Sequence, residues 1–234
     1  MKLNGKIIVI EGTDGSGKQT QTALLKQSLE NMGYDVYTIS FPNYESPSSA
    51  LVKMYLNGDI SNTANEVSAE AASIFYAADR YITYKKEMEE VYKEGKKVIL
   101  LDRYVGSNII HQGAKKIKEM ENLSKEEQEE SLQQFMTWLS NLEYDTLKIP
   151  KPDITFFLNV PIDYTIKLRE KRANKITGGD KQDIHEADTN YLKTAYTAGM
   201  MASKLLGWKV IPCVENDQMR SIEDIHNDIL KNIN

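Results

Sequence analysis

The sequence predicts an α/β fold, a doubly wound five-stranded parallel sheet surrounded by helices. Five short apolar stretches alternate along the 234 residues with helical patterns. Such alternation favours parallel strands joined by right-handed helical crossovers. The length suits one α/β domain with a sizeable core, and the sequence contains no repeat, linker or low-complexity tract. We therefore expect a single domain over residues 1–234.

Composition and charge exclude several classes of protein. The net charge of −5, from 29 basic and 34 acidic residues, argues against a protein that coats nucleic acid. Cys213 is the single cysteine, which excludes a disulfide framework within the chain and a multi-cysteine zinc site. The sequence shows no N-terminal signal segment and no apolar stretch that approaches ~18 residues. We therefore expect a cytoplasmic protein with no membrane partner.

The first strand leads into a glycine-rich loop. Ile7–Ile10 is a β-branched run typical of a strand buried on both faces, and residues 20–32 form a helical pattern. Between them lies G-x-x-x-x-G-K, in which backbone N–H groups, a helix N-terminus and a lysine surround phosphate oxygens. The alternative is a plain strand-to-helix turn, which the flanking elements disfavour. The expected nucleotide-binding residues are Gly12, Thr13, Asp14, Gly15, Ser16, Gly17, Lys18, Gln19 and Thr20.

The second strand and the helix after it come next. Asp35–Ser40 alternates as a strand, and residues 41–48 form a loop at its carboxyl end, where open α/β sheets bind ligands. Thr63 and Glu66 have the spacing of a capping box. This spacing predicts a helix from Thr63 to about Glu94.

Arg80 is an arginine on the apolar stripe of that helix, four residues after Tyr76. A buried guanidinium needs an anionic or acceptor partner. That partner is either a bound ligand or a neighbouring acid such as Asp79, and the spacing leaves both interpretations open.

The third strand ends in two charged residues. Lys97–Leu101 (KVILL) is predicted as a buried strand, and Asp102 and Arg103 follow at its carboxyl end, close to the glycine loop. A carboxylate and an arginine there suit Mg²⁺ and phosphate, although a structural ion pair is the alternative. In the helical pattern that follows, Asn108 and Gln112 are spaced i, i+4, so both amides can face one ligand.

Residues 115–130 are charged throughout and are interpreted as a solvated surface. Ser124 and Glu127 have capping-box spacing, which predicts a helix. Its apolar residues recur at helical period and are expected in the core: Leu132, Phe135, Met136, Leu139 and Leu142.

The last third of the chain supplies two more strands and a basic loop. Ile154–Val160 and Lys209–Cys213 are the strands, and Ser221 precedes the last helix as its cap. The stretch 169–186 is rich in arginine and lysine around Gly178 and Gly179. It is either a mobile lid over phosphates, at about 172–186, or a plain surface loop.

Four segments of the chain resemble the thymidylate kinases, a family of P-loop nucleoside monophosphate kinases. They are EGTDGSGKQT, FYAADRY, DRYVGSNIIHQG and the basic stretch that ends in DIHE, and they span nearly the whole chain in the family's order. The resemblance implies a P-loop NTPase fold with the sheet order 2-3-1-4-5 and a lid. It also implies transfer of the ATP γ-phosphoryl group to dTMP, the cofactor Mg²⁺ and a homodimer.

The resemblance also implies roles for particular residues. Lys18, Arg103 and Asp14 belong to the catalytic set, and Asp102 organises Mg²⁺. The acceptor nucleotide is expected against Asp14, Phe41, Tyr44, Tyr76, Arg80, Arg103, Asn108, His111 and Gln112. Some family members carry a further arginine in the glycine loop, where this chain has Gly15. The lid residue Arg172 is therefore the expected source of a catalytic cation, with Lys175 second.

The chain departs from the family pattern in four places. Gln19 replaces the usual Ser or Thr, Tyr44 stands where many members have arginine, and His111 replaces Tyr or Phe. Residues 115–147 form a longer helical insertion. These differences keep two alternatives open, a kinase for another deoxynucleotide or deoxynucleoside and a P-loop regulatory ATPase.

Overall fold

The structure, a computed structural model, describes residues 3–61, 66–166 and 189–233. Its centre is a five-stranded parallel sheet in the order β2-β3-β1-β4-β5, which confirms the predicted fold and sheet order. The strands are β1 (Ile7–Gly12), β2 (Val36–Ser40), β3 (Val98–Asp102), β4 (Ile154–Asn159) and β5 (Lys209–Pro212). The five predicted strands coincide with these except at their end residues.

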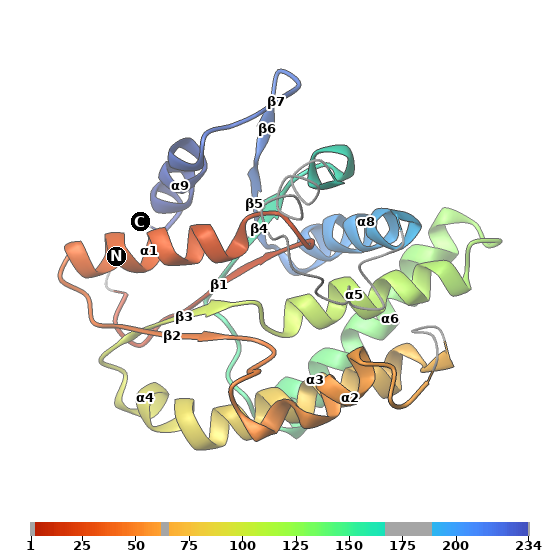
Figure 1. Ribbon diagram of the computed structural model, residues 1–234, viewed down its shortest axis with the longest axis horizontal. Coiled ribbons are helices and arrows are strands. Elements are labelled where there is room, and N and C mark those ends of the chain that lie inside the picture. The colour runs from red at the N-terminus through yellow and green to blue at the C-terminus, as the bar shows by residue number, and fades with distance from the viewer. Residues whose placement is uncertain (1–2, 62–65, 167–188, 234) are drawn as a thin grey trace.

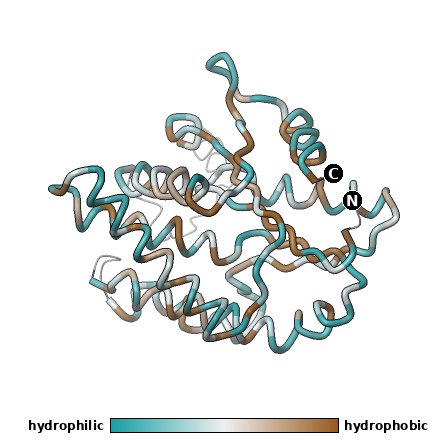
Figure 2. Tube along the Cα trace, turned by 180° about the vertical axis from the view of Figure 1, so that it is seen from behind, coloured by the Kyte–Doolittle hydropathy of each residue, from teal (hydrophilic) through white to brown (hydrophobic). Residues whose placement is uncertain are grey.

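Helices cover both faces of the sheet (Figure 1). Their bounds are α1 (Lys18–Asn31), α3 (Ala69–Thr83), α5 (Val105–Glu119), α6 (Lys125–Ser140), α8 (Thr189–Leu206) and α9 (Ile222–Lys231). Ile8 and Ile10 enter an apolar layer with α1 and α9, whereas Ile7 and Val9 enter the layer with α3, α5, α6 and α8. Figure 2 shows that the central strands are mostly hydrophobic, whereas the outer helices and turns carry many hydrophilic residues.

The start of α3 differs from the prediction. The helix begins at Ala69, and the Ser68 side chain accepts a hydrogen bond from Ala71 N at 3.1 Å. Glu66 is in a 3₁₀ turn and residues 67–68 are not helical, so no continuous helix runs from Thr63 into α3 and the predicted start is wrong; Thr63 itself lies outside the described residues. Ser68 is as good an N-cap as Thr63, so spacing could not decide between them.

The helix continues further along the chain, as predicted. After α3, the π-helical turn Tyr84–Met88 leads into α4 (Glu89–Glu94), which ends at Gly95 with a φ of 64°. Two short elements were not predicted, the 3₁₀ turn Pro47–Ser49 and α2 (Ala50–Leu56). Both lie between β2 and α3, and they pack against α3.

The charged stretch 115–130 is only partly a solvated surface. α5 continues to Glu119, and its Lys115 is 5% exposed, so that interpretation is wrong at Lys115. The capping box of Ser124 and Glu127 is confirmed, and α6 continues into a π-helical turn, Asn141–Thr146. The predicted core residues Leu132, Phe135, Met136 and Leu139 are buried, and Leu142 is partly buried.

The C-terminal part contains one unpredicted hairpin. β6 (Val214–Glu215) and β7 (Gln218–Met219) pair antiparallel around Asn216 and Asp217, both with positive φ. Cys213, just before the hairpin, is buried, and burial raises the pKa of its thiol to about 12, as befits an unreactive core thiol. None of the described helices is both long and apolar enough to cross a membrane. The predicted lid, 172–186, lies outside the described residues.

Candidate active site

The loop between β1 and α1 forms a cradle that Lys18 closes. Gly12 has a φ of 156°, which residues with a side chain rarely adopt, and a Cβ there would lie 2.5 Å from Ser16 Oγ and 3.3 Å from Leu158 O, so the tight path of the loop favours glycine. Lys18 Nζ donates hydrogen bonds to the carbonyl oxygens of Gly12, at 3.0 Å, and Thr13, at 2.8 Å. Burial, reinforced by the charge of Arg103, lowers the pKa of Lys18 to about 8. A phosphate group would offer this ammonium a stronger partner than two carbonyls.

Glu11 ties the cradle to α5, and the sequence analysis missed it. Its carboxylate accepts hydrogen bonds from Tyr104 N at 2.8 Å, Ser107 N at 2.9 Å and Ser107 Oγ at 2.5 Å. The carboxylate thereby caps the first turn of α5, where its charge is favourable. Burial raises the pKa of Glu11, while these hydrogen bonds oppose that shift. A glutamate directly after an apolar strand was the available signal.

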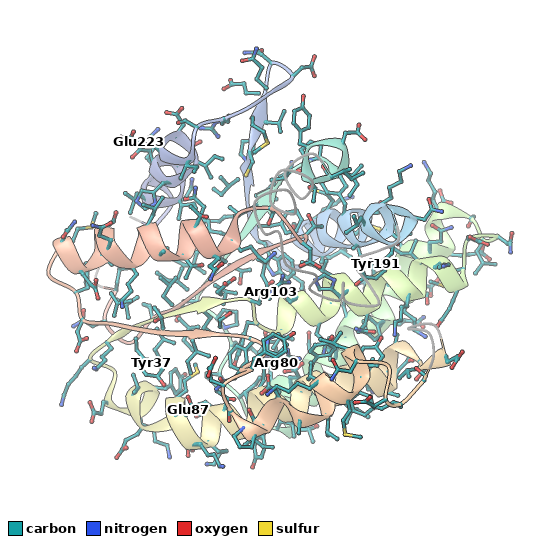
Figure 3. All side chains as sticks on the ribbon, viewed as in Figure 1. Tyr37, Arg80, Glu87, Arg103, Tyr191 and Glu223 are labelled. Carbon is teal, nitrogen blue, oxygen red and sulfur yellow. The ribbon has the colours of Figure 1, made fainter. Side chains whose placement is uncertain are left out.

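Arg103 follows β3 and lies at the centre of the molecule (Figure 3). Its φ of 67° is a left-handed conformation that residues other than glycine rarely adopt. Nη2 forms an ion pair with Asp14 Oδ1, and Nη1 lies 3.2 Å from His111 Nε2. Burial by itself would raise the pKa of Asp14, but the charge of Arg103 holds it well below its usual range. The ion pair of Arg103 is therefore with the cradle, not with Asp102.

His111 is a neutral imidazole whose tautomer follows from its partners. Arg103 Nη1 can only donate, so His111 Nε2 accepts and carries no proton. Nδ1 therefore bears the proton and donates to Tyr191 Oη at 2.7 Å. Burial, with the charges of Arg103 and Lys18, lowers the pKa of His111 to about 4. Tyr191 of α8 could not be predicted, because the contact spans 80 residues.

Asp102 is the described residue best suited to Mg²⁺. Its Oδ2 lies 3.5 Å from Ser40 Oγ, and its buried Oδ1 has no hydrogen-bond partner among the described residues. An orphaned carboxylate oxygen at the carboxyl end of β3 fits a hard cation that keeps most of its other ligands as water and phosphate. Within the described ranges, no three His, Cys, Asp or Glu side chains gather as a metal site. Gln19 and Thr20 are exposed at the start of α1.

A cavity of about 220 Å³ opens next to the cradle, between α3 and α5. All nine predicted acceptor-binding residues line it: Asp14, Phe41, Tyr44, Tyr76, Arg80, Arg103, Asn108, His111 and Gln112. The structure thus brings together residues that are far apart in the sequence. Leu56, Ser107 and Tyr191 line the cavity as well, and the sequence did not indicate them.

The amides of Asn108 and Gln112 are buried and under-satisfied. Asn108 Nδ2 donates to Ser73 O at 3.2 Å, but its Oδ1 has no partner among the described residues. Gln112 is fully buried, and neither amide atom of its side chain has a described partner. Buried polar groups without partners are costly, so a pair of them along one cavity wall indicates a polar ligand.

Arg80 has a buried acidic partner, and it is not Asp79. Nε and Nη2 of Arg80 donate to Glu143, at 2.6 and 2.5 Å, in a bidentate pair whose side chains are 3% and 0% exposed. Asp79 instead accepts from Asn43 N at 2.9 Å and Ser48 Oγ at 2.6 Å. Glu143 lies in the insertion 115–147, which therefore anchors the arginine that lines the cavity.

This arrangement can hold two phosphorylated ligands side by side. One end of the cavity, with Asp14 and Arg103, adjoins the phosphate cradle, while the other end has apolar and amide groups suited to a planar base. The catalytic cation expected at Arg172 lies outside the described residues, so the structure does not place it. A P-loop cradle next to a second nucleotide-sized cavity defines a nucleoside monophosphate kinase.

Comparisons with known proteins agree with this class. The thymidylate kinase family profile matches residues 10–229, so the chain belongs to the thymidylate kinase family. "Thymidylate kinase" of Plasmodium falciparum is 30% identical over 232 residues, which cover 99% of this chain and 91% of the relative. "Probable thymidylate kinase" of Pyrococcus horikoshii is 29% identical over 230 residues, with 97% and 95% covered.

A solved structure shares the fold. The thymidylate kinase of Candida albicans superposes with a TM-score of 0.67 over 100% of this chain and 92% of its own. The two sequences are 21% identical, so this likeness concerns the fold.

Proposed function

We propose that this chain transfers the γ-phosphoryl group of ATP to dTMP and releases dTDP and ADP. The cavity beside the cradle carries the proposal, because a regulatory ATPase would bind one nucleotide and would have no use for a second site. Family membership supports the identity of the acceptor, since the relatives are named for thymidylate.

At the phosphate end, charged groups position the reacting atoms. Lys18 leaves the loop carbonyls to bind the donor phosphates. Arg103 uses two donors for Asp14 and His111, which leaves further N–H groups for the acceptor phosphate. Asp14 is close enough to this phosphate or the sugar 3′-hydroxyl to orient it. Phosphoryl transfer depends mainly on such positioning and on charge neutralisation.

At the base end, Tyr76 stacks on thymine and the amides of Asn108 and Gln112 bond its edge. Arg80 has two of its guanidinium nitrogens on Glu143, which leaves Nη1, 3.5 Å from Tyr104 O, to donate to the base. The pair with Glu143 holds the guanidinium in one orientation, which favours recognition of a single base.

Mg²⁺ completes the donor site. Asp102 would hold the ion through Oδ1, together with ATP phosphates and water, since Gln19 offers no hydroxyl. When bound, the ion neutralises charge on the transferring phosphates. From the sequence we also propose that the stretch 172–186 supplies a further catalytic cation. Arg172 is the first candidate for this role and Lys175 the second.

The reaction products test the proposal directly. The chain is incubated with ATP, Mg²⁺ and, in separate samples, dTMP, dUMP, dGMP or thymidine, and phosphorus NMR follows the products. We expect one dTDP for each ADP and the fastest turnover with dTMP. A faster reaction with another acceptor would make the dTMP assignment wrong. Hydrolysis of ATP with no phosphorylated acceptor would instead indicate a regulatory ATPase.

We also propose a cytoplasmic homodimer that forms through the outer faces of α2 and α3. Large apolar side chains are exposed there: Leu51 at 41%, Met54 at 45%, Ile74 at 51% and Tyr81 at 38%. Sedimentation should give twice the chain mass of 26.6 kDa, and Ile74→Asp should reduce it to one chain. Ile222→Asp, on the exposed side of α9, is the control and should leave the dimer intact.

A further inference from the structure

Lys115 is a buried lysine that has no place in the reaction described above. It follows Asn108 by seven residues and Gln112 by three, so the three side chains share one face of α5. Its Nζ lies 2.5 Å from Tyr55 Oη, 3.1 Å from Val67 O and 4.9 Å from the centre of the Tyr55 ring. Lys115 therefore joins α5 to α2 and to the segment that leads into α3.

Stability alone gives a poor reason for a lysine at this position. Removing an ammonium group from water is costly, and a phenol and one carbonyl compensate only in part. Burial accordingly lowers the pKa of Lys115 to about 8, with Glu119 acting in the opposite direction. An unbranched apolar side chain such as methionine would fill similar space without that cost.

The partners of Lys115 lead to the base end of the cavity. The Tyr55 ring packs edge-on against Tyr76, with centroids 6.4 Å apart at 86°, and against Phe75, with centroids 6.0 Å apart. Tyr76 and Leu56, the residue after Tyr55, line the cavity opposite the amides of α5. The position of Tyr55 therefore influences the width of the slot between Tyr76 and these amides.

We propose that Lys115 is a positioning residue for the acceptor base. By holding Tyr55 and the Val67 carbonyl against α5, it sets the distance between Tyr76 on one wall and Asn108 and Gln112 on the other. This proposal rests on the proposed function, because it assumes that a planar base occupies the slot. Lys115 itself does not line the cavity, so it acts through Tyr55.

The test separates acceptor binding from chemistry. Lys115→Met, Tyr55→Phe and the double variant are compared with the parent in dTMP affinity by calorimetry, and in kcat and the KM for ATP. We expect each single variant to raise the Kd for dTMP about tenfold, because the slot between Tyr76 and the two amides is then no longer held at the width that fits the base. The double variant should be no worse than Lys115→Met, because the hydrogen bond that Tyr55→Phe removes is already lost when Lys115 is replaced. The kcat at saturating dTMP and the KM for ATP should stay within twofold.

Controls distinguish the proposal from a general loss of structure. Lys118→Met makes the same change at an exposed position of α5 and should leave the Kd for dTMP unchanged. Lys115→Arg keeps a charged donor and should restore part of the affinity. If Lys115→Met does not fold, Tyr55→Phe decides, because it keeps the buried ring and removes only the hydroxyl.

Three results would overturn the proposal. They are a dTMP affinity within twofold of the parent in both single variants, additive effects in the double variant, or a loss of kcat without a loss of affinity. Failure of the proposed function looks different, because the parent itself would then prefer another nucleoside monophosphate. The same variants are in that case titrated with the preferred nucleotide, and unchanged affinity would again refute the role of Lys115.

Discussion

Gln112 has a fully buried side-chain amide that lacks a described partner in the free protein. Replacing it by leucine removes this unsatisfied group, so Gln112→Leu should stabilise the free protein by ~1 kcal/mol in urea denaturation. The same change should weaken dTMP binding at least tenfold, because the bond to the base is lost. Leu132→Ala, in the apolar core of α6, is the control that should lower stability. A Gln112→Leu variant that is both less stable and unchanged in dTMP affinity would contradict a ligand role for the amide.

Substitutions at Asp102 and at Gln19 should affect the Mg²⁺ dependence of the reaction to very different extents. Asp102→Asn reduces the charge of the one described carboxylate suited to the ion, so the Mg²⁺ concentration for half-maximal activity should rise at least tenfold. Gln19→Thr restores a hydroxyl at an exposed position and should change that concentration by less than threefold. The reverse order of effects in a Mg²⁺ titration would show that the ion lies at the start of α1 instead.

Lys18 should set an alkaline limit for donor binding. Burial and Arg103 lower its pKa in the free protein to about 8, so the ammonium is lost as the pH rises through that value. Because kcat/KM reports the free enzyme, kcat/KM for ATP should fall above about pH 8. The kcat should persist to higher pH, since bound phosphates favour the charged lysine. Parallel profiles for kcat and kcat/KM would contradict this assignment.

At the scale of elements, the buried pair between α3 and the turn 141–146 should be a major source of stability. Glu143→Gln leaves the Arg80 guanidinium buried without a counter-charge, which should cost ~3–5 kcal/mol of unfolding free energy. Asp145→Asn is the matched control, because Asp145 lies 3.9 Å from Lys151 in an exposed pair. It should cost less than ~1 kcal/mol. Equal losses in the two variants would mean that Arg80 is not held by Glu143.

The helices and strands also show which parts of the fold could be predicted from the sequence. The central strands β1, β3 and β4 are mostly buried apolar runs, and the outer strands β2 and β5 are short stretches with Val and Ile, so all five could be predicted. The capping box of α6 and the serine N-cap of α9 have local signatures. The first residue of α3 could not be predicted from the sequence, because Thr63 and Ser68 are both of residue types that favour the N-cap position. Glu143, the partner of Arg80, and Tyr191, the partner of His111 Nδ1, lie 63 and 80 residues away, and no local pattern indicates a contact over such separations. The residues expected to bind the acceptor were predicted by resemblance, and their shared cavity is a finding of the structure.

At the scale of the molecule, the two ligand sites lie together at the carboxyl ends of the sheet's strands. The cradle follows β1, Arg103 follows β3, and the cavity lies between α3 and α5 on the same side. The contacts Asp14–Arg103–His111–Tyr191 connect the loop after β1, the end of β3, α5 and α8. This connection explains why a fold of this kind can bind two nucleotides with their phosphates adjacent.

Calorimetric titration of dTMP into the ATP-free protein, with and without saturating ADP, tests this two-site account most directly. We expect one dTMP per chain in both conditions, because ADP fills the cradle and leaves the cavity open. Lys18→Met, the control, should weaken ADP binding and preserve dTMP binding. Competition between dTMP and ADP for one site, or no dTMP binding at all, would contradict it.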